Sequence, residues 1–374
     1  MVNDPRLDIA GAELHELEQS LAHLGEPRFH GRQIFQWIHK RGVTDVALMS
    51  DLSRELRAAL AGHFDLRTPS VVRREQSADG TTKFLLRLDD GKHIETVCIP
   101  ESFSGSTDPS EADRITFCVS TQVGCAMRCA FCLTGRMGID RNLTAGEIVG
   151  QVRVLVRELG LNDQRFNIVL MGMGEPLHNY DNTMKALRIL ADEHGMAVSP
   201  RRVTLSTVGV LPALERLATE PVMPNLAISL HSTTEAQRDR LVPINRKYGI
   251  EELLNACRRF PLKRRERITF EYVMLKDVND TPEDARRLVR LLSGIKGKVN
   301  LLPLNEAAGI PFERPSDAAV NRFARILSER GVTVSVRKSR GRDIRAACGQ
   351  LITESGRDTA PGRRLAMAMS SSVV

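Results

Sequence analysis

The sequence predicts an α/β protein built around a mostly parallel sheet that helices cover. From residue 115 onward, short apolar runs rich in β-branched residues alternate with longer segments of helical periodicity. No internal repeat of fixed period competes with this pattern. Parallel strands need crossover connections, and a helix is their usual form. The alternation therefore indicates either an open sheet or a full or partial barrel.

The elements of this sheet can be assigned in order along the chain. Helical periodicity is clearest over residues 145–159 and 317–330. The predicted strands are 115–120, 167–171, 202–206, 225–230, 268–274, 298–303 and 332–336. We expect the core domain to span residues 114–352, and a short polar tail at 353–374 to be disordered.

Residues 1–80 are predicted to form a small N-terminal helical accessory domain. Apolar residues recur at helical spacing in GRQIFQWIHKRG and again over residues 48–60, with Phe35 and Trp37 as packing residues. The segment can be a plain helical domain or a domain that docks RNA. In the second interpretation the phosphate partners are Arg28, Arg32, Lys40 and Arg41.

A β-hairpin and linker are predicted over residues 81–113. Residues 82–99 alternate between apolar and polar side chains around Asp89-Asp90-Gly91, which is typical of a hairpin turn. The polar stretch at 101–114 reads as a loop.

Composition limits the class of protein. Among 374 residues, 53 are basic and 46 acidic, and the pI is near 9.2, which modestly favours a polyanionic partner. The N-terminus lacks the apolar core of a signal peptide, and no run approaches the roughly 18 apolar residues of a transmembrane helix. Seven cysteines in such a chain argue against a disulfide framework and for metal or catalytic roles in a reducing cytoplasm.

Three cysteines stand close together as Cys125-x3-Cys129-x2-Cys132. Three thiolates on one loop can bind three irons of a [4Fe–4S] cluster and leave the fourth iron open. The open iron can bind the amino and carboxylate groups of S-adenosylmethionine (SAM). The alternative is a zinc site with Cys118 or a distant histidine as fourth ligand, although no second C-x2-C pair is present.

Beyond the cysteines, the sequence resembles the radical SAM superfamily and, more narrowly, the RlmN/Cfr family of RNA adenine methyltransferases. The resemblance runs from about residue 15 to Leu351. It implies a partial (β/α)6-type barrel with an accessory N-terminal domain. The segments that carry it are HGRQIFQWIHKRGV, GKHIETVCIP, MGMGEPLHN, TLSTVG, ISLHS, LLPLN, PFERPS and SRGRDIRAACGQL.

The resemblance also implies a set of SAM contacts at the ends of predicted strands. The backbone after residues 167–171 would receive the SAM amino group, and other strand ends would bind the rest of the molecule. Each residue also has a plainer explanation, such as a strand cap, a tight turn or a buried histidine. The matching residues are Gly174, Glu175, Ser206, Ser229, Leu230, His231 and Asn305.

In this family a protein thiol carries the methyl group, because adenine carbon 2 is too electron-poor to attack SAM directly. The resemblance implies that Cys348 accepts a methyl group from one SAM. A 5′-deoxyadenosyl radical from a second SAM then removes a hydrogen atom, and the carbon radical adds to adenine. Cys118 would resolve the adduct through a transient disulfide with Cys348. Glu95 would accept the proton, although Cys118 is an alternative acceptor and Glu95 can equally be an outward-facing strand residue.

The surroundings of Cys348 are basic, which would favour its thiolate and could also bind phosphates. The residues concerned are Arg337, Lys338, Arg340, Arg342 and Arg345. A further basic run at 263–267 is either a solvated face or an RNA contact. Cys98 and Cys257 are expected in the core.

The expected function is methylation of carbon 2 of an adenosine in 23S rRNA and in tRNAs by a monomer. An electron donor such as flavodoxin or ferredoxin would serve it. Three alternatives stay open: methylation at carbon 8, a zinc-stabilised RNA-binding protein without catalysis, and a radical SAM enzyme acting on a small molecule or peptide.

Overall fold

The computed structural model describes residues 6–102 and 107–353. The predicted tail at 353–374 therefore lies almost wholly outside the described residues. Seven parallel strands form the main part of a ten-stranded sheet, and each lies beside the strand that precedes it in the series. They are β6 (Arg114–Cys118), β9 (Phe166–Leu170), β10 (Val203–Thr207), β11 (Asn225–Ser229), β12 (Ile268–Met274), β13 (Gly297–Pro303) and β14 (Val334–Val336).

This arrangement confirms the predicted α/β class, and all seven predicted strands form. Because crossovers between parallel strands are right-handed, a sheet built in chain order keeps its helices on one side. The edge strands of the sheet, β14 and β3 (Ser70–Gln76), are not paired with each other in the described ranges. The sheet is therefore an open arc, as in a partial barrel.

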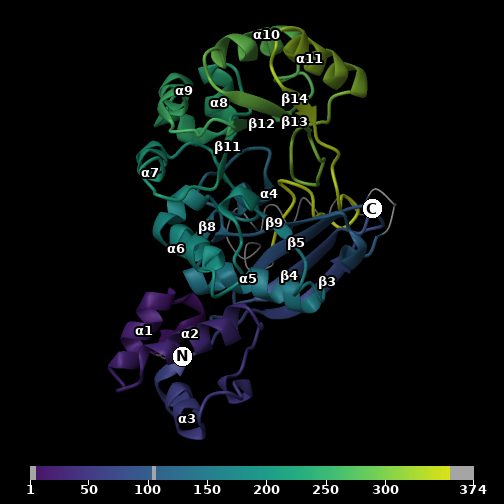
Figure 1. Ribbon diagram of the computed structural model, residues 1–374. Coiled ribbons are helices and arrows are strands. Elements are labelled where there is room, and N and C mark those ends of the chain that lie inside the picture. Colours follow the sequence, from purple (N-terminus) through teal and green to yellow (C-terminus); the bar gives the residue numbers. More distant parts are fainter. Residues whose placement is uncertain (1–5, 103–106, 354–374) are drawn as a thin grey trace.

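Helices cover the outer side of this arc (Figure 1). Several begin with a capping box, as at Thr144 with Glu147 and at Thr281 with Asp284. The covering helices are α5 (Ala145–Glu158), α6 (Tyr180–Ala191), α7 (Leu211–Leu217), α8 (Glu235–Leu241), α9 (Ile250–Arg259), α10 (Pro282–Leu291) and α11 (Asp317–Glu329).

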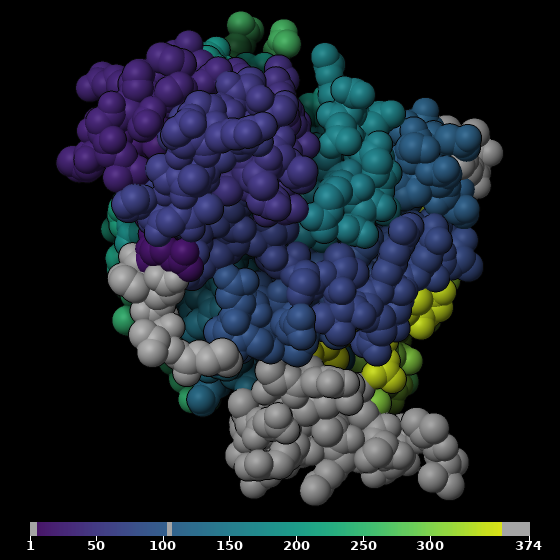
Figure 2. All heavy atoms as spheres, turned by 90° about the horizontal axis from the view of Figure 1, so that it is seen from below, coloured from purple at the N-terminus to yellow at the C-terminus, as the bar shows by residue number. Residues whose placement is uncertain are grey.

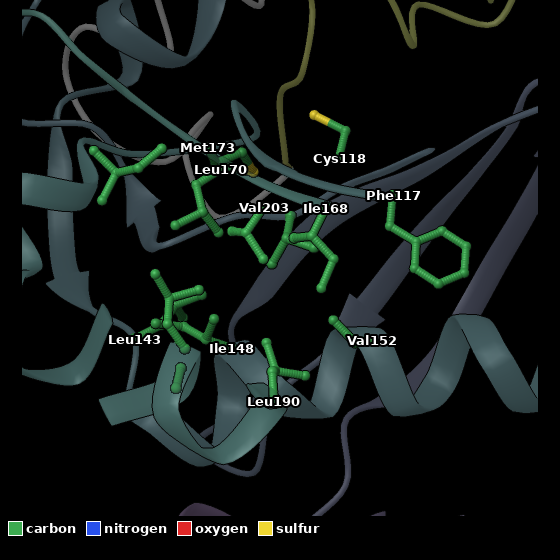
Figure 3. Close-up of a cluster of buried hydrophobic side chains, with 14 of the residues drawn as sticks. Phe117, Cys118, Leu143, Ile148, Val152, Ile168, Leu170, Met173, Leu190 and Val203 are labelled. Atoms are coloured by element: carbon green, nitrogen blue, oxygen red, sulfur yellow. The ribbon is translucent and has the colours of Figure 1, made fainter. Parts of the chain in front are cut away.

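The core between β6 and α5 shows how the sheet separates packing from chemistry. Phe117 of β6 and Val152 of α5 belong to the same buried apolar cluster. Figure 3 shows Phe117 and Cys118 pointing to opposite sides of their strand, as alternation along a strand requires. Cys118 therefore faces the inner side of the arc, away from α5.

Three antiparallel strands extend the sheet beyond β6. The predicted hairpin is confirmed as β4 (Thr82–Arg87) and β5 (His93–Glu101). The third strand, β3, pairs with β4 in a stretch that we expected to belong to a helical domain, so the helical prediction is wrong after residue 63. The sequence SVVRREQ has no clear apolar alternation because most of this edge strand is exposed, and its pairing with β4 decides its structure.

The N-terminal domain consists of α1 (Leu14–Ala22), α2 (Arg28–His39) and α3 (Arg54–His63), with a short parallel pair formed by β1 (Leu7–Asp8) and β2 (Phe64–Asp65). Phe35 is fully buried, as predicted. Figure 2 shows these helices and the strands that follow them spread over one face of the molecule. The buried Arg153 of α5 joins the two parts by donating to the carbonyl oxygen of Val43 at 2.8 Å.

Short 3-10 helices complete the described elements. They are Ile9–Gly11, Val46–Leu48, Pro109–Glu111, Pro176–Asn179, Pro200–Arg202 and Pro243–Arg246. Within the described ranges, none of the helices has both the length and the apolarity that a bilayer-spanning helix requires.

Candidate active site

A cavity of about 160 Å³ lies at the carboxyl ends of the parallel strands, where α/β folds collect their ligands. Strands β9 to β13 contribute its wall, the cysteine loop closes one side, and the segment after β14 closes another. The polar and sulfur-bearing side chains of its lining, with one glycine, are Cys125, Cys129, Cys132, Gly174, Glu175, Ser206, Ser229, His231, Glu271, Asn305, Arg337 and Cys348.

The three clustered cysteines all line this cavity. Their loop runs from β7 (Gln122–Gly124) to α4 (Leu133–Met137), and β7 pairs with β8 (Ile139–Asn142). The N–H of Cys125 donates to the carbonyl oxygen of Gly138 at 2.8 Å, and the N–H of Leu133 donates to that of Gly349. The loop is thus fixed at its start by the hairpin and at its end by the segment that carries Cys348.

The electrostatics of the three thiols fit a cluster ligand set. Burial raises the pKa of Cys125 to about 12, and it also raises the pKa values of Cys129 and Cys132. Cys125 and Cys132 each raise the pKa of Cys129 further, so the three groups are close enough to repel one another as thiolates. Three buried thiolates need cationic partners, and the irons of a cluster supply them.

The arrangement of these thiols is not that of a single-ion site. In the described part of the chain, no group of three or more Cys, His, Asp and Glu side chains is placed to hold one metal ion. A cubane cluster binds each cysteine through a different iron, so its ligands need not converge on one point. The zinc alternative gains no support from this geometry.

Polar side chains at the ends of the strands can form hydrogen bonds to a ligand that consists of a nucleoside and an amino acid. The hydroxyls of Ser206 on β10 and Ser229 on β11 lie 3.3 Å apart at the cavity wall. The Oδ1 atom of Asn305 is buried and has no hydrogen-bond partner among the described residues. A buried acceptor without a partner is costly, so a donor from a bound ligand would relieve it.

Gly174 and Glu175 follow β9 and line the cavity. Gly174 has a φ of 108°, which side-chain-bearing residues rarely adopt, and a Cβ there would lie 2.7 Å from the backbone nitrogen of Gln122. The carboxylate of Glu175 accepts from the N–H groups of Leu177 and Val208, both at 3.0 Å. Its pKa is nonetheless raised to about 7 because the side chain is buried. Glu175 thus fixes the loop after β10.

We expect Gly174→Ala to destabilise the protein by about 3 kcal/mol, because the unfavourable φ and the backbone contact add. Gly160→Ala is the matched control, since Gly160 has a φ of 63° and nothing within 4 Å of a new Cβ. The control should cost about 1 kcal/mol. Equilibrium urea unfolding of both variants measures the difference, and equal losses would show that the contact with Gln122 relaxes freely.

Of the other predicted SAM residues, His231 lines the cavity but Leu230 does not. Leu230 is fully buried in the main core. Burial lowers the pKa of His231 to about 3, so the ring is neutral. Its Nδ1 accepts from the N–H of Val273 at 3.0 Å, which leaves the proton on Nε2, and its ring packs edge-on against Phe131.

Cys348 and Cys118 come together although they are 230 positions apart in the chain (348 minus 118). Both line a second, smaller cavity, and Cys348 also lines the first one. Cys348 is exposed, whereas Cys118 is buried and both thiols are free. Burial raises the pKa of Cys118 to about 12, with a further rise from Cys348, so Cys118 is a neutral thiol.

Glu95 is buried, which excludes the alternative of an outward-facing carboxylate. Its Oε1 pairs with the ammonium of Lys83 at 3.0 Å, and its Oε2 accepts from the N–H of Ile352 at 2.8 Å. Glu95 does not line either of the two cavities described above. Cys98 and Cys257 are buried, as expected.

Two segments of the chain match known families. Residues 119–292 match the radical SAM superfamily, and residues 7–66 match the ribosomal RNA large subunit methyltransferase N-terminal domain. The chain is 51% identical to the dual-specificity RNA methyltransferase RlmN of Geobacter sulfurreducens, over 93% of this chain and 92% of that protein. This chain belongs to the RlmN family. It is thus a radical SAM enzyme that methylates RNA, and the superfamily implies a [4Fe–4S] cluster and SAM.

Further relatives agree with the RlmN assignment. The RlmN of Anaeromyxobacter dehalogenans is 48% identical over 99% of this chain and 98% of its own. Among solved structures, a radical SAM methyltransferase from Sphaerobacter thermophilus is 47% identical and superposes with a TM-score of 0.86, covering 92% of this chain and 99% of that one.

Three residues of this RlmN-family site escaped the sequence reasoning, wholly or in part. Arg337 lines both cavities, and its pKa is raised by Cys348, Glu271 and Cys118. Glu271 of β12 lines the main cavity and accepts from Asn300 at 2.8 Å. Arg238 of α8 is fully buried beside the cysteine loop. Arg337 belonged to the basic group predicted around Cys348, but Glu271 and Arg238 read as ordinary charges of a strand and a helix.

Proposed function

We propose that this chain methylates carbon 2 of an adenosine in 23S rRNA and in tRNAs, with Cys348 as the methyl carrier. The observation that carries the proposal is the position of Cys348, which borders both the cavity of the clustered cysteines and the cavity of Cys118. The relatives are named dual-specificity RNA methyltransferases, which supports two classes of RNA substrate.

The proposed ligand set follows the geometry of the main cavity. Cys125, Cys129 and Cys132 would each bind one iron of the cluster. When bound, the cluster supplies the electron that cleaves a carbon–sulfur bond of SAM. The remaining contacts to SAM would come from the backbone at Gly174 and Glu175 and from the side chains of Ser206, Ser229, His231 and Asn305; Leu230 does not line the cavity and is left out of the set.

The chain's own thiols explain how an unreactive carbon can be methylated. A thiolate attacks the methyl group of SAM readily, whereas carbon 2 of adenine does not. Cys348 is exposed, so RNA can reach a methyl group on its sulfur. Arg337 is the cation that lines both cavities beside Cys348.

Release of the methylated base needs a second thiol and a proton acceptor. Cys118 borders the same small cavity as Cys348, and its sulfur would attack the sulfur of Cys348. The disulfide bond would form as the bond between the Cys348 sulfur and the methylene carbon on the base breaks, and that carbon would take up a proton, equivalent to the one lost by the Cys118 thiol, to become the methyl group. An external reductant would then return the disulfide to two thiols. Glu95 is the proposed proton acceptor, with Cys118 as the alternative. The neutral state of buried Cys118 favours Glu95 for this role.

The test of this proposal is the Cys118→Ala variant, purified under anaerobic conditions after exposure to RNA. Without the resolving thiol, RNA should stay covalently attached to Cys348, and nuclease digestion followed by peptide mass spectrometry locates the attachment. Protein that carries iron, sulfide and S-methylated Cys348 but no RNA adduct would contradict the carrier mechanism.

Carbon 2 and carbon 8 are separated by a different measurement. Mass spectrometry of adenosines from the 23S rRNA and tRNAs of a deletion strain should show loss of the 2-methyl product. Loss of the 8-methyl product would instead support the alternative.

The accessory parts of the proposal concern RNA docking and partners. Arg28, Arg32, Lys40 and Arg41 are exposed on or just after α2, where they can contact phosphates. A flavodoxin or ferredoxin as electron donor, a monomeric enzyme and a cytoplasmic location complete the proposal.

A further inference from the structure

We propose that Lys83 is a positioning residue that fixes the Cys348 segment through the carboxylate of Glu95. The inference rests on the proposed function in one respect: the position of Cys348 matters because Cys348 is the proposed methyl carrier. Its structural part, the link from Lys83 through Glu95 to Ile352, stands on the contacts of these residues.

Lys83 is a buried ammonium between two carboxylates. Its side chain is 6% exposed, and its Nζ lies 3.0 Å from Oε1 of Glu95 and 3.2 Å from Oε2 of Glu75. A lysine is almost never this buried unless it is paired, because desolvation of the charge is costly. The side chain of Glu75 is 34% exposed and that of Glu95 is 1% exposed, so the ammonium bridges a half-buried carboxylate and a buried one.

The strand register places this group on the sheet face that carries Cys118. Glu75 of β3 pairs with Lys83 of β4, Lys83 pairs with Val97 of β5, and Val97 pairs with Cys118 of β6. Direct cross-strand partners share one face of a sheet. Glu95 shares that face as well, because it precedes Val97 by two residues.

The second oxygen of Glu95 holds the chain just after Cys348. The N–H of Ile352 donates to Oε2 of Glu95 at 2.8 Å. Two neutral bonds assist: Thr134 donates to the carbonyl oxygen of Leu351 at 2.6 Å, and Leu133 donates to that of Gly349 at 2.8 Å. The bond to Glu95 is the charge-assisted one of these anchors, and such bonds are about twice as strong as neutral ones.

Lys83 acts on Glu95 by its charge as well as by contact. Burial raises the pKa of Glu95, Lys83 lowers it, and Glu75 raises it slightly. The groups that act on this carboxyl are Lys83 of β4, Glu75 of β3 and, from the C-terminal segment, the N–H of Ile352. Removing Lys83 therefore raises the pKa of Glu95 further. A protonated Glu95 is a weaker acceptor, so the Cys348 segment loosens.

The experiment compares Lys83→Met, Lys83→Arg and Glu75→Gln in the full-length, cluster-loaded protein. The first readout is hydrogen exchange at the amide of Ile352, expressed as protection relative to the unfolded peptide. At neutral pH we expect about a tenfold loss of protection in Lys83→Met, which recovers as pH rises through the raised pKa of Glu95. Lys83→Arg keeps the cation and should keep the protection.

The second readout is the pH dependence of single-turnover RNA methylation. The acid side of the profile should move to higher pH by about one unit in Lys83→Met, and to lower pH in Glu75→Gln, which removes an anion near Glu95. If Lys83 served only to fill space, its replacement would change the methylation rate by the same factor at every pH. The pH at which the rate is half-maximal would then not move. The opposite shift in Glu75→Gln is decisive if Lys83→Met does not fold, because Glu75 is half-exposed.

Unchanged protection of Ile352 together with unshifted profiles in Lys83→Met and Glu75→Gln would overturn the inference. Loss of protection in Lys83→Met, in a protein whose wild type never methylates RNA, would support the positioning role and overturn the proposed function instead.

Discussion

Replacing Cys348 with alanine is expected to abolish RNA methylation while the protein keeps its iron, sulfide and SAM. Cys348 is exposed at the edge of both cavities and forms no part of the packed core, so its removal should leave the fold and the three clustered cysteines intact. If the methyl group travels on its sulfur, the rate should fall by at least about 10³-fold, as for the loss of other covalent carriers. Transfer of labelled methyl groups from SAM to 23S rRNA fragments measures this.

The matched control is Cys257→Ala, which removes a thiol that lies in the core and outside both cavities. This variant should methylate RNA at nearly the wild-type rate, although its stability should fall slightly. Full activity of Cys348→Ala would exclude the carrier and favour a radical SAM reaction of another kind. Colourless protein with zinc in place of iron and sulfide would instead favour the zinc alternative.

Apart from the largely exposed edge strand β14, most strands of the core could be predicted because their residues are buried or half-buried on both faces. Such strands appear as continuous apolar runs such as residues 167–171 and 225–230, bounded by turns. β3 could not be predicted from its own residues, because its polar sequence reflects an edge position and its conformation comes from pairing with β4. The same holds for β7 and β8, which are too short for any period to be visible.

The candidate site could likewise be predicted only where its residues are close together in the sequence. The cysteine triplet is local in sequence, so its spacing alone indicates a shared metal group. The meeting of Cys118 with Cys348 depends on the whole fold, and only the family resemblance pointed to it. Leu230 shows the limit of such transfer, since it matches the family position but its side chain lies in the core and not at the cavity.

Buried charged residues are the features that are hardest to predict from the sequence. Lys83 stands in TTKFLL and Arg238 in EAQRDRL, where each reads as an ordinary surface residue. Both are buried in the structure because partners from neighbouring strands and loops surround them. Such partners cannot be read from periodicity, which reports only whether a face is apolar.

Arg238 is therefore expected to give the second large effect. Its guanidinium is fully buried and donates to four acceptors on three segments: the carbonyl oxygens of Leu230, Val208 and Ser229, and Oδ1 of Asn245. Burial lowers its pKa to about 10, which still leaves it charged at neutral pH. Arg238→Met should lower the free energy of unfolding by about 4 kcal/mol, because these buried acceptors lose their donors. Urea unfolding measures the loss.

The control on the same helix is Arg240→Met, since Arg240 is exposed and should change stability by no more than about 0.5 kcal/mol. Arg238→Lys should recover only part of the loss, because an ammonium cannot reach acceptors on several segments at once. The carbonyls that Arg238 holds belong to the ends of β10 and β11, where Ser206 and Ser229 face the cavity. SAM should therefore bind Arg238→Met more weakly even where that variant is folded, as anaerobic calorimetry would show. Wild-type affinity and stability in this variant would mean that the ends of β10 and β11 are fixed without the guanidinium.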